Sequence, residues 1–145
     1  MPTIYHQAGI AGTPEQIFTA LTTTSELAAW WTRDTRGNCE AGGLIEFYFG
    51  KLRMGMQVIE TTANKRVRWR SISGDGEWQD TKIVFELCPD ANQTLVNFSH
   101  ENWADVTDLF RHCSTKWAVF LLSLKDYIET GEGRPYPDDI QINHW

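Results

Sequence analysis

The sequence predicts an α+β fold in which a curved antiparallel sheet of six or seven strands surrounds one long C-terminal helix. Three observations lead to this class. Two short helical patterns follow one another within residues 13–31, and strand-like segments then occupy residues 44–100 with no helical pattern between them. Closely spaced strands of this kind are typical of an antiparallel meander. Apolar residues in 107–130 recur at intervals of three and four, which predicts a helix with one apolar face.

A strand over residues 3–10 is expected first, and the two short helices follow it. Thr13 is a suitable N-cap for the first helix, Pro14 suits its first turn, and Gln16 completes a capping box. Ser25 is the expected cap of the second helix. These local signals place both helices before the meander.

Five strand-like segments follow a polar loop at residues 33–43. Alternate residues within each segment are apolar, so one face of the sheet is apolar and rich in aromatic residues while the other is polar. The inner face is predicted to carry Phe47, Phe49, Met54, Met56, Val58, Trp69, Ile83, Phe85, Leu87, Val96, Phe98 and His100. Such a sheet needs a cover on its apolar side.

The expected cover is the helix over residues 107–130. Asp105 or Thr107 can cap its start, and Gly131 can end it. At 1.5 Å per residue, a helix of about 23 residues is about 35 Å long, which is enough to cross a strongly curved sheet. The tail from about residue 134 is polar and contains prolines, a composition compatible with partial order.

The length of 145 residues is most simply that of one domain spanning residues 1–145. The net charge of −6 argues against a nucleic-acid partner, which would need a basic face, and against binding to anionic lipid surfaces. No apolar run approaches the roughly 18 residues of a membrane-spanning helix, so no membrane insertion is expected.

Cysteine usage bears on the compartment and on metal binding. Cys39, Cys88 and Cys113 are odd in number and widely spaced, and no Cys-x-x-Cys motif is present. This pattern argues against a zinc or redox motif. The residues after Met1 include no hydrophobic run of the kind found in a signal peptide. We therefore expect a cytoplasmic protein with reduced thiols, no metal and no cofactor.

The predicted order of elements is that of the helix-grip fold, and the chain resembles the START-related superfamily (SRPBCC). Within it, the chain resembles the family named after the activator of the heat-shock-protein-90 ATPase, from about Tyr5 to Gly133. The residues that carry the resemblance are Pro14, Glu15, Gln16, Ile17, Phe18, Ala20, Leu21, Thr22, Leu27, Trp30, Trp31, Gly42, Gly43, Val67, Trp69, Thr81, Trp117, Leu121, Leu124 and Gly131. The resemblance implies a START-like domain with an elongated apolar cavity between the sheet and the long helix.

Inward-facing aromatic and methionine side chains are the candidate lining of such a cavity, since pockets of this kind are mainly apolar with few polar anchors. The candidates are Phe47, Phe49, Met54, Met56, Trp69, Phe85, Phe98 and Trp117. His100 would be a polar anchor near one end, and Trp30 or Trp31 would stand near an opening. The simpler interpretation is that most of these side chains fill a bulky core, because apolar residues are ordinarily buried.

No catalytic set is evident in the sequence. His100 could act as a proton shuttle, but a histidine at such a position more often makes one structural hydrogen bond. His112 and Cys113 are neighbours on a helix and cannot face one metal ion together. A Gly-containing loop carries a carboxylate cluster that is expected to be solvated: Asp75, Glu77 and Asp80.

Three functions are compatible with these features. The first is non-catalytic binding of a small hydrophobic or lipid-like ligand in the cavity. The second is a protein-interaction or co-chaperone-like role with a protein partner, which the family name suggests. The third and weaker one is a cyclase- or hydrolase-like activity in the same pocket. An enclosed apolar void would favour binding, and a filled core with an exposed apolar patch would favour interaction. The sequence leaves the oligomeric state open.

Overall fold

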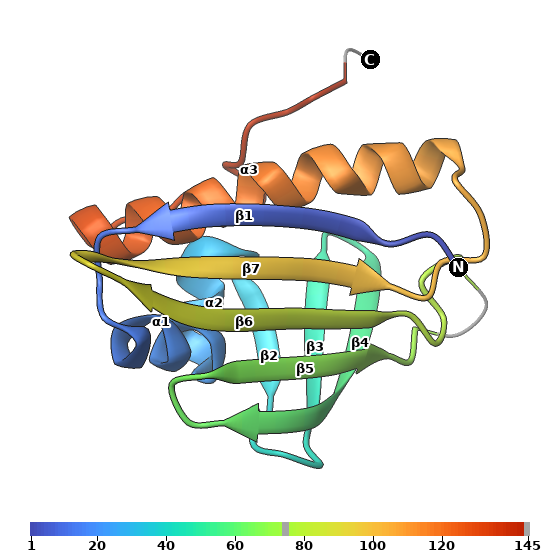
Figure 1. Ribbon diagram of the computed structural model, residues 1–145. Coiled ribbons are helices and arrows are strands. Elements are labelled where there is room, and N and C mark those ends of the chain that lie inside the picture. Colours follow the sequence, from blue (N-terminus) through green and yellow to red (C-terminus); the bar gives the residue numbers. More distant parts are fainter. Residues whose placement is uncertain (74–75, 144–145) are drawn as a thin grey trace.

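Seven strands and three helices follow one another in the computed structural model, which describes residues 1–73 and 76–143 (Figure 1). The strands are β1 (Ile4–Ile10), β2 (Asp34–Gly37), β3 (Leu44–Phe49), β4 (Leu52–Thr62), β5 (Arg66–Ser71), β6 (Lys82–Asp90) and β7 (Gln93–Glu101). The helices are α1 (Pro14–Leu21), α2 (Thr24–Trp30) and α3 (Asp108–Thr130). The strands form one antiparallel sheet in the order β1-β7-β6-β5-β4-β3-β2. This arrangement confirms the predicted helix-grip fold.

The two N-terminal helices begin close to the predicted positions. Thr13 Oγ1 accepts a hydrogen bond from the backbone N–H of Gln16 at 3.2 Å, and Gln16 Oε1 accepts one from the N–H of Thr13 at 2.9 Å. The predicted capping box is therefore confirmed. The cap of α2 is Thr23 rather than Ser25, because the carbonyl of Thr23 already accepts the N–H of Leu27 at 2.9 Å. Ser25 lies inside the helix.

Strand β2 lies in the segment that the sequence predicts as a polar loop. Its four residues pair with β3 at the edge of the sheet, and they are largely exposed. An edge strand of this kind has little surface to bury, so its sequence carries no apolar alternation. The pattern of apolar residues therefore could not predict that β2 pairs with β3. With β2 the sheet has seven strands.

Helix α3 begins and ends as predicted. Thr107 Oγ1 accepts the N–H of Phe110 at 3.1 Å, and Gly131 ends the helix with a φ of 87°. Figure 1 shows α3 lying alongside β1, where Lys125 Nζ donates to the carbonyl of Gly9 at 2.7 Å. In the part of the chain that the structure describes, no helix is long and apolar enough to cross a membrane.

Aromatic side chains fill the concave side of the sheet around Trp31, which follows α2. Its ring centroid lies 4.1 Å from that of Phe47, 5.0 Å from that of Trp117 and 5.8 Å from that of Trp69. Phe85 meets Trp69 edge-on at 5.3 Å. Each such pair contributes about 0.5–1.5 kcal/mol beyond the burial of its apolar area. The middle of the sheet is therefore closed by direct packing.

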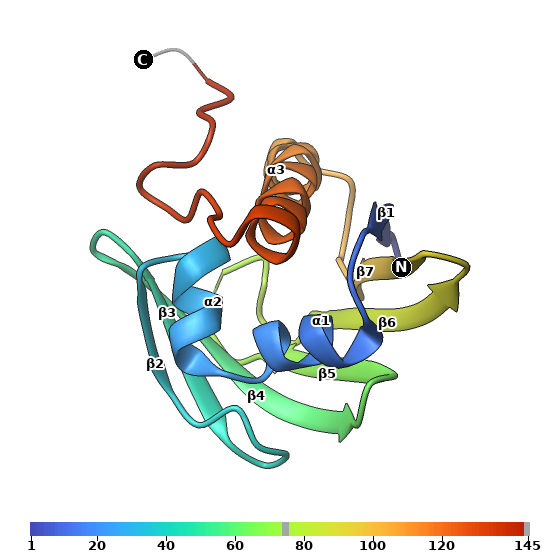
Figure 2. The same cartoon turned by 90° about the vertical axis from the view of Figure 1, so that its left-hand side faces the viewer.

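The segment after α3 turns back beside α2 and α3 (Figure 2). Ser123 Oγ on α3 donates to the carbonyl of Trp30 and accepts the N–H of Arg134, both at 2.7 Å. The N–H of Tyr136 then donates to the carbonyl of Trp31 at 2.8 Å. The tail is thus hydrogen-bonded to the same two elements that hold the aromatic core.

Replacing Gly133 by alanine tests this attachment of the tail. A Cβ atom at Gly133 would lie 2.6 Å from the carbonyl oxygen of Ala29, which is backbone and cannot rotate away. We expect Gly133→Ala to lower the free energy of unfolding by about 1–3 kcal/mol, the usual cost of overpacking. Urea unfolding measures the loss. Gly76→Ala is the matched control because, apart from its chain neighbours, no atom of the described residues lies within 4 Å of the added Cβ. An equal effect of both changes would contradict the prediction.

Candidate ligand pocket

A pocket of about 460 Å³ lies between α3, the β3–β4 hairpin, the described residues next to Trp78, and the C-terminal tail. This volume is in the range of about 300–1,000 Å³ that is usual for small-molecule sites. Most of the lining is apolar. Its aromatic rings come from β3 and α3, from the residue that follows α2, from the segment between β5 and β6, and from the C-terminal tail. The aromatic side chains that line it are Trp31, Phe49, Trp78, Trp117, Phe120 and Tyr136. The pocket is a partly open hollow at the side of α3 rather than an enclosed channel along it.

Four of the residues predicted to contact a ligand line this pocket. They are Trp31, Phe49, Met54 and Trp117. Phe49 comes from β3, Met54 comes from β4, and Trp117 comes from the middle of α3. A ligand contact for each of the four stays a prediction.

The other inward-facing candidates lie in the closed core and are not among the lining residues. Phe47, Met56, Trp69, Phe85 and Phe98 are each at most 2% exposed. The expectation of an elongated cavity lined by them therefore differs from the structure. The reason is the position of the two short helices, because α1 and α2 place large side chains inside the concave sheet and fill the space that α3 alone would leave open.

The tryptophan pair divides between core and pocket. Trp30 is fully buried, and its Nε1–H donates to the carbonyl of Ala20 at 3.0 Å. Trp31 stacks against Trp69 on one side, within 6° of parallel, and lines the pocket. Trp31 follows α2 as its C-cap, and of the two residues only Trp31 lines the pocket.

His100 is buried beneath the pocket in a short hydrogen-bonded chain. The Nε1–H of Trp117 donates to His100 Nδ1 at 3.0 Å, so the imidazole is neutral with its proton on Nε2. That Nε2 lies 2.8 Å from Thr81 Oγ1, which donates onward to the carbonyl of Trp78 at 2.6 Å. Burial lowers the pKa of His100 to about 3. His100 is therefore a satisfied core histidine, and it is not a lining residue.

The remaining reactive groups near the pocket have partners of their own. Burial raises the pKa of the Cys113 thiol to about 11, and its Sγ accepts the Nε1–H of Trp78 at 3.3 Å. Glu77 accepts the hydroxyl of Thr107, while Asp80 pairs with an arginine of β5. Asp75, the third member of the predicted carboxylate cluster, lies outside the described residues. Among the residues that the structure describes, no group of three or more His, Cys, Asp and Glu side chains could hold a metal ion.

Sequence reasoning missed several lining residues. Trp78 follows a Gly-containing loop, and Tyr136 lies in the tail, so neither belongs to a periodic pattern. Leu52 and Leu109 stand at element ends and are 59% and 38% exposed. Phe120 lies on the apolar face of α3, but its place in the pocket lining depends on where the tail lies. The sequence feature that could have indicated these lining residues is a single large apolar residue at the end of a helix or strand.

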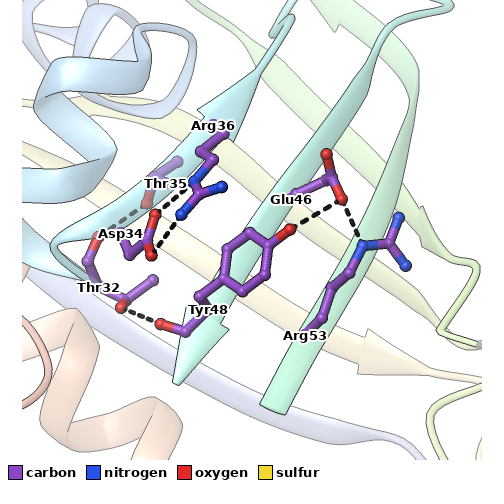
Figure 3. Close-up of polar contacts among 7 residues, drawn as sticks. All are labelled: Thr32, Asp34, Thr35, Arg36, Glu46, Tyr48 and Arg53. Carbon is purple, nitrogen blue, oxygen red and sulfur yellow. Dashed lines mark hydrogen bonds and ion pairs between the residues drawn. The ribbon is translucent and has the colours of Figure 1, made fainter. Parts of the chain in front are cut away.

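A polar network covers the outer face of β2, β3 and β4 beside the pocket (Figure 3). The guanidinium of Arg36 lies 4.5 Å from the ring centroid of Tyr48, whose hydroxyl donates to Glu46 at 3.2 Å. Arg53 also donates to Glu46 and keeps the pKa of that carboxyl below its usual range. Because Arg53 belongs to the lining, this pairing means that its charge is already balanced at the pocket.

A curved sheet around a terminal helix, with a partly open apolar pocket beside that helix, defines a helix-grip domain. The family model described as Activator of Hsp90 ATPase homolog 1-like protein matches residues 11–129, and the chain belongs to this family. The resemblance inferred from the sequence is thereby confirmed. A search of the curated proteins found no match.

Solved structures agree with this assignment. The Aha1 dimer from Colwellia psychrerythraea is 44% identical, with a TM-score of 0.86, and the alignment covers 92% of this chain and 100% of that one. CalU16 from Micromonospora echinospora is 15% identical, with a TM-score of 0.81 and coverage of 99% and 75%. A conserved protein of unknown function from Enterococcus faecalis is 24% identical, with a TM-score of 0.72 and coverage of 96% and 78%. The last two show a shared fold alone.

The buried state of His100 predicts a pH dependence of stability. Its pKa is about 3 in the folded protein and about 6.5 when unfolded. Between these values the unfolded chain binds one more proton, so the free energy of unfolding falls as the pH falls. From about pH 7 to about pH 5 the loss due to His100 is about 2 kcal/mol.

Urea unfolding at both pH values measures this effect against His100→Gln. Glutamine can accept from Trp117 and donate to Thr81 without titrating in this range. The variant should lose most of the dependence, whatever its stability at neutral pH. If the free energy of unfolding of the variant depended on pH as strongly as that of the native protein, groups other than His100 would cause the dependence.

Proposed function

We propose that this protein binds a small hydrophobic ligand in the pocket beside α3, without catalysing a reaction on it. The observation that carries the proposal is a pocket of about 460 Å³ whose lining includes six aromatic side chains. Aromatic walls offer large apolar contact area, and stacking against them adds stabilisation beyond burial. Met54 adds a flexible side chain that adapts to ligands of different shape.

The state of the side chains that could have acted in catalysis supports binding without a reaction. The enzyme alternative depended on His100 or on a loop carboxylate. His100 is neutral, fully hydrogen-bonded and outside the lining. Cys113 lines the pocket, but the raised pKa of its thiol keeps it in the unreactive protonated form. The cyclase- or hydrolase-like hypothesis therefore gains no support from these residues.

A neutral fluorescent probe tests the binding proposal. N-phenyl-1-naphthylamine should bind the native protein with enhanced emission and should quench tryptophan fluorescence, because Trp31, Trp78 and Trp117 line the pocket. Met54→Trp should fill part of the pocket and weaken probe binding at least about tenfold. A titration of probe emission measures both affinities.

Leu122→Trp is the matched control for Met54→Trp. Leu122 is 55% exposed on α3 and does not line the pocket, so the same enlargement there should leave the affinity unchanged. Circular dichroism verifies that both variants are folded. If native protein does not bind the probe, or if both variants bind as native protein does, the pocket is not a hydrophobic binding site.

A co-chaperone-like role is the second candidate. It is favoured by membership of the family named after the activator of the Hsp90 ATPase and by 44% identity to a protein named Aha1. That relative was solved as a dimer, and self-association of this chain is part of the same hypothesis. We place either activity in the cytoplasm, where the three free cysteines would stay reduced.

Adding the purified protein to an Hsp90 tests the second candidate. A co-chaperone-like role predicts a faster rate of ATP hydrolysis that saturates with the concentration of this protein, measured with an Hsp90 inhibitor as the background control. Light scattering after size exclusion gives the oligomeric state in the same samples. An unchanged ATPase rate over the full concentration range would remove the co-chaperone hypothesis and leave the ligand proposal in place.

A further inference from the structure

The C-terminal tail places one carboxylate in the wall of the pocket. Asp139 is among the lining residues, although its side chain is 0% exposed to solvent. Its Oδ2 forms an ion pair with Lys116 of α3. Its Oδ1 is buried and has no hydrogen-bond partner among the described residues. A buried carboxylate oxygen without a donor is unfavourable, so the pocket wall contains a hydrogen-bond acceptor that lacks a donor in the described part of the chain.

The other charged groups of the lining are already engaged. Lys116 Nζ donates to Asp139 and, at 3.0 Å, to the carbonyl of Ile140. Arg53 is paired on the outer face, and Glu77 accepts the hydroxyl of Thr107. The charges that line the pocket thus occur in balanced pairs or accept a hydrogen bond. This balance favours a neutral ligand over an ion.

We propose that Asp139 is the specificity-determining residue of the pocket and selects small, neutral, mainly aromatic molecules that carry a hydroxyl or N–H donor. This inference rests on the proposed ligand-binding function and names its substrate class. The aromatic walls accept the body of the ligand, and Asp139 Oδ1 accepts its donor. Since no solvent reaches that side chain, binding through Oδ1 requires the neighbouring tail residues Ile140 and Gln141, which are exposed, to move outward.

Two naphthalenes of nearly equal shape test the inference on the full chain. 2-Naphthol carries a hydroxyl donor, whereas 2-methoxynaphthalene carries only an acceptor and is the more hydrophobic of the two. An apolar pocket without an anchor prefers the ether. A pocket with Asp139 as anchor prefers the naphthol by about tenfold or more, because hydrogen bonds to charged groups are the stronger ones. Dissociation constants come from calorimetry or from quenching of tryptophan emission.

The double variant Asp139→Leu/Lys116→Met removes the acceptor without leaving a buried charge, a replacement that is often tolerated. It should abolish or reverse the preference for 2-naphthol. The matched control is Arg33→Gln, which breaks the exposed ion pair with Asp138 and loosens the tail but keeps Asp139. The control should retain the preference. Asp139→Asn serves as a second variant if the double variant fails to fold by circular dichroism, and it should reduce the preference because its acceptor carries no charge.

The outcomes separate this inference from the function on which it rests. If neither naphthalene binds native protein, the proposed ligand binding itself fails. If both bind and the naphthol is not preferred, the pocket is a binding site but Asp139 is not its anchor. If native protein prefers the naphthol and the folded Asp139 variants keep the full preference, another group supplies the acceptor and the assignment to Asp139 is overturned.

Discussion

The packing of Trp31 is the contact on which the rest of this structure depends. Its indole meets aromatic rings from β3, β5 and α3, and its backbone carbonyl receives the N–H of Tyr136 from the tail. One residue at the end of a seven-residue helix therefore joins the sheet, the long helix and the C-terminal segment. The ring packs against the aromatic core on the concave side of the sheet. It also lines the pocket, so it forms the boundary between the closed core and the pocket.

The space that is left explains the character of the pocket. The pocket lies between α3 and the β3–β4 hairpin. Phe49 and Phe120 both line the pocket, and their ring centroids lie 6.4 Å apart. The tail crosses the same side and adds Tyr136, whose ring lies 5.3 Å from Phe49. A pocket built in this way has aromatic walls, and the tail supplies one of them.

Family membership and site chemistry answer different questions about this protein. The family match and the 44% identical Aha1 structure establish the fold and the relationship. Folds host many functions, so function has to be argued from particular residues. Here the buried polar groups divide into two kinds. His100 is satisfied on both ring nitrogens and stabilises the core, whereas Asp139 has one oxygen without a partner and lies in the pocket wall. Only the second kind points toward a ligand.

Local signals in the sequence determined the elements of this fold. The capping box at Thr13, the parity of the strands and the stripe of α3 between Thr107 and Gly131 depend on short-range chemistry, so they can be recognised without a structure. Tertiary packing alone decided which aromatic side chains fill the core and which line the pocket. Phe47 and Phe49 share a strand face, yet one is in the core and the other lines the pocket. That difference depends on how far α2 and the tail reach, and parity along a strand carries no information about the elements that cover it.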